Sequence, residues 1–158
     1  MLKLKPYIQT KSNCGPTSLR IVLGYYNINK SEKYLAKLSG CTIKHGTEPE
    51  GLLKAAESLG LKGFVKYNSD IKDIRKYVVN KTVPVIVNWF SISPISAEGH
   101  YSVVADINRN NIYLMDPESG SIRKIKLSEF KKLWFDFKGE FINSNDDLIL
   151  RAMIVIYK

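Results

Sequence analysis

The chain has 158 residues, of which 44% are apolar and 25% charged, a composition that excludes a disordered or fibrous protein and is typical of one folded domain. Its formal net charge is +9, but the lysines are scattered, and no run of five basic residues indicates a nucleic-acid partner. Two cysteines are too few for a secreted disulfide scaffold, and no apolar stretch is long enough for a signal peptide or a membrane span. We therefore expect a single cytoplasmic domain over residues 1–158, with no nucleic-acid partner and no stable membrane insertion.

Helical spacing dominates the first part of the chain. The apolar residues that recur at helical intervals just after Cys14 are Leu19, Val22, Leu23 and Tyr26. Ser31 is expected to cap a second, short helix, because its hydroxyl can accept a hydrogen bond from a free N–H group of the first turn.

The middle of the chain carries two further helix-start signals. The segment Thr47-Glu48-Pro49-Glu50 fits a capping box with proline in the first turn, which predicts a helix from there to Leu59. A short strand is expected over 64–67, and Asp70 is expected to cap the next helix.

The second half of the chain is rich in strand-forming residues. Strands are predicted over the ranges 83–90, 101–107, 112–115, 122–125 and 148–157. Ser128 is expected to cap a short helix that ends at Trp134. Helices first and a mostly antiparallel sheet second predict an α+β fold, in which an N-terminal helical half packs on the sheet.

The strongest chemical signal is the segment from Gln9 to Leu19, which contains Cys14-Gly15-Pro16. Cys14 stands at the start of a predicted helix, where the helix dipole and the free N–H groups favour an anion and hence a reactive thiolate. We expect Gly15 to let a substrate backbone come close. Taken alone, the segment also fits a buried structural cysteine.

A cysteine nucleophile needs a base, and the sequence offers His45 and His100. His100 begins a predicted core strand, which would hold its ring on a rigid element. Asp116 ends the neighbouring predicted strand, so we expect its carboxylate to hold Nδ1 of His100 and to stabilise the imidazolium. A core histidine and an ordinary Asp-Pro turn are the alternatives for each residue taken singly.

Two more polar groups bear on the chemistry. The Gln9 side-chain amide and the Cys14 N–H are candidates to stabilise the oxyanion that forms during acyl transfer. The pair Cys41 and His45 suggests zinc, but a zinc site would need two further ligands, and no CxxC pair is present.

The ordered motifs resemble those of the peptidase C39 family, the bacteriocin-processing, papain-like cysteine peptidases. The segments that carry the resemblance are Gln9, Cys14-Gly15-Pro16-Thr17-Ser18, Gly46 to Gly60, Pro84 to Val87, Gly99 to Val104, Asp116 to Gly120 and Leu127 to Trp134. The sequence departs from the family pattern in that Gln9 stands five residues before Cys14 instead of six. Asn13 stands where an acidic residue often precedes the cysteine.

The resemblance implies a papain-like fold and a cysteine peptidase that needs no cofactor and no metal. In this enzyme Cys14 is the nucleophile, His100 the base and acid, and Asp116 the residue that orients His100, while Gln9 is the oxyanion donor. The resemblance also implies a peptide or protein substrate cut after a Gly-Gly pair, with an ABC exporter as a possible partner in trans.

Three other functions stay open. The fold can serve a non-proteolytic peptide-binding domain, although the presence of Cys14 and His100 favours chemistry. A thiol acyltransferase or amidase would use the same two residues with another acyl donor or acceptor. The third alternative is a zinc-binding interaction module around Cys41 and His45. Substrate selectivity is expected to come from a loop over 90–99 above the cleft.

Overall fold

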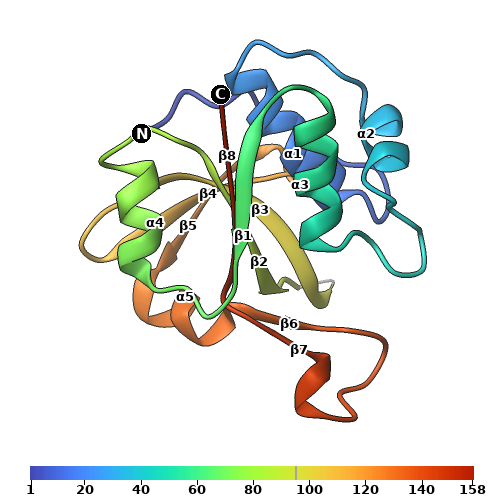
Figure 1. Ribbon diagram of the computed structural model, residues 1–158. Coiled ribbons are helices and arrows are strands. Elements are labelled where there is room, and N and C mark those ends of the chain that lie inside the picture. Colours follow the sequence, from blue (N-terminus) through green and yellow to red (C-terminus); the bar gives the residue numbers. More distant parts are fainter. Residues whose placement is uncertain (95) are drawn as a thin grey trace.

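The computed structural model describes residues 1–94 and 96–158, and its centre is a six-stranded sheet (Figure 1). The strand order is β1-β8-β2-β3-β4-β5, and each neighbouring pair runs antiparallel. The strands are β1 (Lys62–Lys66), β2 (Val85–Ile92), β3 (Ala97–Ile107), β4 (Asn111–Asp116), β5 (Ser121–Lys126) and β8 (Ala152–Tyr157).

Helices cover both faces of this sheet (Figure 1). One face carries α1 (Cys14–Tyr25), α2 (Glu32–Leu38) and α3 (Pro49–Ser58), and the other carries α4 (Ile71–Val78) and α5 (Leu127–Leu133). The predicted α+β fold is confirmed, with α4 on the face opposite the other helices of the first half. Among the described residues, every helix is too short or too polar to span a lipid bilayer.

The alternation of side chains along β2 explains the two cores. Ile86 belongs to the cluster under α1 and α3, whereas Val85 and Val87 belong to the cluster under α4 and α5. Successive residues of a strand point to opposite faces, and because both faces are covered, Val85, Ile86 and Val87 are all apolar, while the polar Asn88 and Ser91 lie buried further along the strand. The strand therefore shows no polar alternation in the sequence.

Two of the predicted helix caps are confirmed. Ser31 Oγ accepts a hydrogen bond from Tyr34 N over 3.2 Å, and Asp70 forms a capping box with Asp73. Both side chains satisfy N–H groups that the first turn of a helix leaves free.

The other two predicted caps are wrong. The N-cap of α3 is Glu48 instead of Thr47, and that of α5 is Lys126 instead of Ser128; neither makes a side-chain capping bond. Pro49 suits the first position of α3 with its fixed φ, and this preference sets the start of that helix without a capping side chain. The expected loop over 90–99 consists mainly of strand, since β2 ends at Ile92 and β3 begins at Ala97, while residue 95 lies outside the described residues.

The expected strand over 148–157 is divided into two. Arg151 has a left-handed backbone with φ of 46°, and it separates β7 (Leu148–Leu150) from β8. This break lets β7 leave the main sheet and pair with β6 (Phe135–Phe137), forming a ribbon that reaches away from the sheet (Figure 1). A short 3-10 helix, η1 (Asn145–Asp147), lies in the loop between these two strands. The ribbon contacts β2 and β3 and forms one wall of the cleft described below.

Arg151 should be sensitive to the shape of its replacement. We expect Arg151→Val to lower the free energy of unfolding by about 1–2 kcal/mol, because a β-branched residue tolerates the left-handed region poorly. Arg151→Gly should be tolerated, since glycine adopts this conformation without strain. Urea unfolding of the two variants beside wild type checks the order, and equal stability of both variants would contradict it.

Candidate active site

Cys14 is the first residue of α1, half-buried beside a surface cleft. The buried side of the helix packs against β3 and fixes its direction. A Cβ at Gly15 would lie 3.2 Å from Thr47 and 3.3 Å from the ring of Tyr101, so glycine lets the start of the helix come close to β3. The close contacts of Gly15 are therefore inside the protein, and they bring the helix start to the strand that carries His100.

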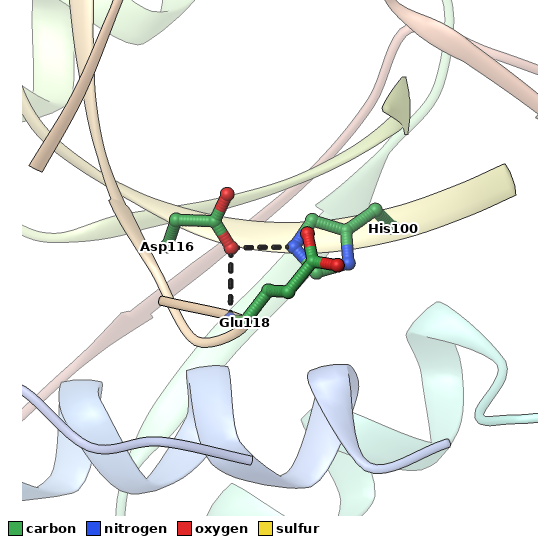
Figure 2. Close-up of side chains that lie close together, drawn as sticks. All are labelled: His100, Asp116 and Glu118. Atoms are coloured by element: carbon green, nitrogen blue, oxygen red, sulfur yellow. Dashed lines mark hydrogen bonds and ion pairs between the residues drawn. The ribbon is translucent and has the colours of Figure 1, made fainter. Parts of the chain in front are cut away.

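His100 on β3 and Asp116 at the end of β4 form a buried pair. His100 Nε2 lies 2.7 Å from Asp116 Oδ1, and their side chains are only 5% and 2% exposed, so water competes little for this bond (Figure 2). The sequence-based expectation that Nδ1 makes this contact is wrong. Because Nε2 meets the carboxylate, Nδ1 is the ring nitrogen left to face a thiol.

Asp116 has two further partners. Its Oδ1 accepts a hydrogen bond from Glu118 N over 3.0 Å (Figure 2), and its Oδ2 lies 3.5 Å from Arg123 Nη1. The Arg123 guanidinium also donates to Ser91 Oγ and Ile92 O and stacks over Trp89. Arg123 was not expected from the sequence, because a cation in an ordinary strand carries no motif. Arg123 therefore holds the Asp116 carboxylate at Oδ2, the oxygen that does not meet His100.

The charges around His100 favour its protonated form. Burial on its own lowers the pKa of His100, but hydrogen bonds and charges from Asp116 and Cys14 outweigh burial and raise the pKa from 6.5 to about 10. Burial raises the pKa of Asp116, whereas its contacts with His100, Glu118 N and Arg123 lower it, and the net shift is downward. An imidazolium paired with a carboxylate is therefore the favoured state near neutral pH.

Gln9 lines the same cleft, on the segment that leads into α1. Its N–H donates to the carbonyl of Pro117 over 2.8 Å, which ties this segment to the turn after Asp116. Gln9 Oε1 is buried and has no hydrogen-bond partner among the described residues. The structure thus brings Gln9, Cys14 and His100 to one cleft, with Asp116 bonded to His100, although Gln9 is only five residues from Cys14.

The cleft has a volume of about 650 Å³ and is open to solvent. One wall is the loop between α2 and α3, with Ile43 and His45, and the other is the β6–β7 ribbon. The ring of Phe90 stacks with those of Phe135 and Phe137, at centroid distances of 5.2 and 6.0 Å, which anchors the ribbon against β2. This size and shape suit an extended peptide.

Asp136 on β6 lines the cleft, and its carboxylate lies against Gly99. A Cβ at Gly99 would collide with the Asp136 carboxylate, so glycine directly before His100 permits this contact. Burial and the charges of Glu48 and Glu98 raise the pKa of Asp136 from 3.8 to about 6, against the lowering effect of hydrogen bonds from Phe137 N and Asn88. Asp136 was not expected from the sequence, because β6 was not predicted.

Cys41 and His45 are not assembled as a metal site. Cys41 Sγ donates to Ser12 O and to Asn13 Oδ1, each over 3.4 Å, while His45 is exposed. Within the described residues, neither joins a group of three candidate metal ligands. The group of that kind that is present combines His100, Asp116 and the exposed Glu118 (Figure 2), and there His100 Nε2 and Asp116 Oδ1 are already bonded to each other.

The chain is similar in sequence to several known proteins. The chain is 33% identical over 122 residues to an uncharacterized protein of Methanothermobacter marburgensis, a match that covers 77% of this chain and 76% of that protein. It is 30% identical over 128 residues to the lactococcin-G-processing and transport ATP-binding protein LagD of Lactococcus lactis, which covers 81% of this chain but 17% of LagD. It therefore spans less than a fifth of that transporter.

The structure is also similar to the crystal structure of the peptidase domain of Streptococcus ComA, a bi-functional ABC transporter involved in quorum sensing. The TM-score is 0.71 at 25% sequence identity, and the match covers 99% of this chain and 98% of that one. A sequence model of the peptidase C39 family matches residues 5–138, most of the chain. The chain belongs to the peptidase C39 family.

Proposed function

We propose that the protein is a cysteine peptidase that hydrolyses a peptide bond with Cys14, His100 and Asp116 as its catalytic triad. The observation that carries this proposal is the buried His100–Asp116 pair beside the same cleft that Cys14 lines. A nucleophile at a helix start, a base on a rigid strand and a carboxylate that orients the base are the parts that nucleophilic catalysis requires.

The reaction would proceed through a thioester. In the proposed resting state His100 already holds the proton of Cys14, and the thiolate attacks the carbonyl carbon of the scissile bond, whose oxygen becomes an oxyanion. His100 then gives its proton to the leaving amine, and the acyl group remains on sulfur. A water molecule, deprotonated by His100, releases the acid and restores the thiol.

Two donors are proposed for the oxyanion. The N–H of Cys14 belongs to the first turn of α1, whose N–H groups have no partner within the helix. Gln9 lies at the same cleft, and the hydrogen bond from its N–H to the Pro117 carbonyl holds its backbone there. Donors that are already oriented towards a developing charge stabilise a transition state more than flexible ones do.

The proposed substrate is a peptide or protein precursor that is cut after a Gly-Gly pair. This chain resembles a part of LagD, and LagD is named for the processing of lactococcin G. By the same analogy, we propose that the chain acts in the cytoplasm and that an ABC exporter is its partner in trans.

Replacement of the nucleophile gives the first test. We expect Cys14→Ala to lower cleavage of a synthetic Gly-Gly peptide by about a thousandfold or more, because no other group replaces the thiolate. Mass spectrometry of the products measures cleavage, thermal melting checks the fold, and Ser58→Ala, on the exposed side of α3, serves as the matched control. Cleavage by Cys14→Ala at the wild-type rate would refute the assignment. Products joined to an added amine would show acyl transfer in place of hydrolysis.

The pH profile gives the second test. The raised pKa of His100 means that the imidazolium persists until the pH approaches about 10, so the alkaline limb of kcat/KM should lie there instead of near 6.5. Asp116→Asn removes the charge that holds this proton, so the limb should move down by about 1–3 pH units. An alkaline limb at the same pH in both proteins would contradict the role of Asp116.

A further inference from the structure

A single carboxylate of α2 holds the segment between Gln9 and Cys14. Glu32, the first residue of α2, accepts hydrogen bonds from Thr10 N over 3.0 Å, from Asn13 Nδ2 over 2.9 Å and from Thr17 Oγ1 over 2.5 Å. The hydroxyl of Thr10 donates to it as well. Its partners therefore lie on both sides of Cys14, in the preceding turn and in the first turn of α1.

These contacts require an ionised acceptor. Four donors meet the two oxygens of Glu32, and a carboxylate accepts such bonds at both oxygens whereas an amide offers only one acceptor atom. Burial on its own raises the pKa of Glu32, but the hydrogen bonds from Thr10, Thr17 and Asn13 outweigh burial and lower it. The negative charge is therefore present at neutral pH.

The turn that Glu32 holds is short and tightly bent. Thr10 O accepts from Asn13 N over 3.1 Å, and Ser12 has a left-handed backbone with φ of 65°. On the other side of Gln9, its own N–H is bonded to Pro117 O. The direction of the Gln9 side chain and that of the Cys14 N–H are thus set by two anchors, the turn after Asp116 and the carboxylate of Glu32.

We propose that Glu32 is a positioning residue of the oxyanion site, whose carboxylate holds the 10–13 turn so that the Gln9 amide and the Cys14 N–H meet at one oxygen atom. The inference rests on the proposed peptidase function. Glu32 bonds to Thr10, Asn13 and Thr17 and does not line the cleft, so it acts through the turn and not on the substrate.

This role separates two reactions of the same thiol. Alkylation by iodoacetamide needs a reactive thiolate, but it displaces iodide and builds no oxyanion on a carbonyl oxygen. Attack on a peptide carbonyl needs the thiolate and the oxyanion donors together. A residue that merely supported the fold, or the Cys14–His100 pair, would affect both reactions alike.

The experiment compares Glu32→Gln with Glu57→Gln, which changes an exposed carboxylate of α3 outside the cleft. In Glu32→Gln we expect kcat for a Gly-Gly peptide to fall about 10- to 100-fold, with KM and the rate of Cys14 alkylation unchanged. Glu57→Gln should match wild type in all three. Equal kcat in the two variants, or an equal fall in kcat and in alkylation for Glu32→Gln, would overturn the inference.

A double-mutant cycle tests the proposed route through Gln9. If Glu32 acts by placing the Gln9 amide, the Glu32→Gln substitution should cost far less kcat in a Gln9→Ala background than in wild type, because the group that it positions is gone. Fully additive effects of the two substitutions would show that Glu32 does not act through Gln9 and would overturn this route.

A peptide aldehyde that ends in glycinal separates failure of this inference from failure of the proposed function. The Cys14 sulfur bonds to the aldehyde carbon, the π electrons of the C=O bond move to the oxygen, and that oxygen takes the proton of His100. The bound aldehyde protects Cys14 from iodoacetamide, so the degree of protection reports on the oxyanion site without turnover. We expect Glu32→Gln to weaken protection at least about tenfold. If wild type cleaves the peptide but Glu32→Gln and Glu57→Gln bind the aldehyde equally well, the inference about Glu32 is refuted and the proposed function is not. Wild type that neither cleaves nor binds would refute both.

Discussion

The buried hydrogen bond between His100 Nε2 and Asp116 Oδ1 is the contact on which the site depends. It fixes the ring and leaves Nδ1 for the thiol, and the carboxylate offsets the cost of a buried positive charge. Arg123 and Glu118 N in turn hold the Asp116 carboxylate, one at each of its oxygens. Without this bond, burial would lower the pKa of His100 with only the contact of Cys14 acting against it.

The other parts of the site are arranged around that pair by elements far apart in the chain. Close packing of the start of α1 on β3 brings Cys14 to the cleft, and the bond from Gln9 N to Pro117 O joins the oxyanion segment to the turn that Asp116 begins. The β6–β7 ribbon can form one wall of the open cleft because Arg151 interrupts the last strand. A break in one strand thus shapes the surface that a substrate would meet.

Much of the architecture was predictable from local patterns. Helical spacing after Cys14, the caps at Ser31 and Asp70 and the apolar strands all produce signals within a few residues. The order of Gln9, Cys14, His100 and Asp116 was sufficient to group these residues, since His100 and Asp116 lie on adjacent strands. Their roles in catalysis stay a proposal.

Features that depend on distant contacts were not predictable. The ring nitrogen that meets Asp116 depends on how β3 turns its side chain at the cleft, and no local pattern encodes that choice. Arg123 and Glu32 gain their importance only from partners on other elements. Nuclear magnetic resonance of the protein labelled with ¹⁵N in its histidine rings measures the protonation state of His100. We expect both ring nitrogens of His100 to carry protons at pH 8 and the imidazolium to lose one near pH 10. A neutral ring at pH 8, titrating near 6.5, would contradict it.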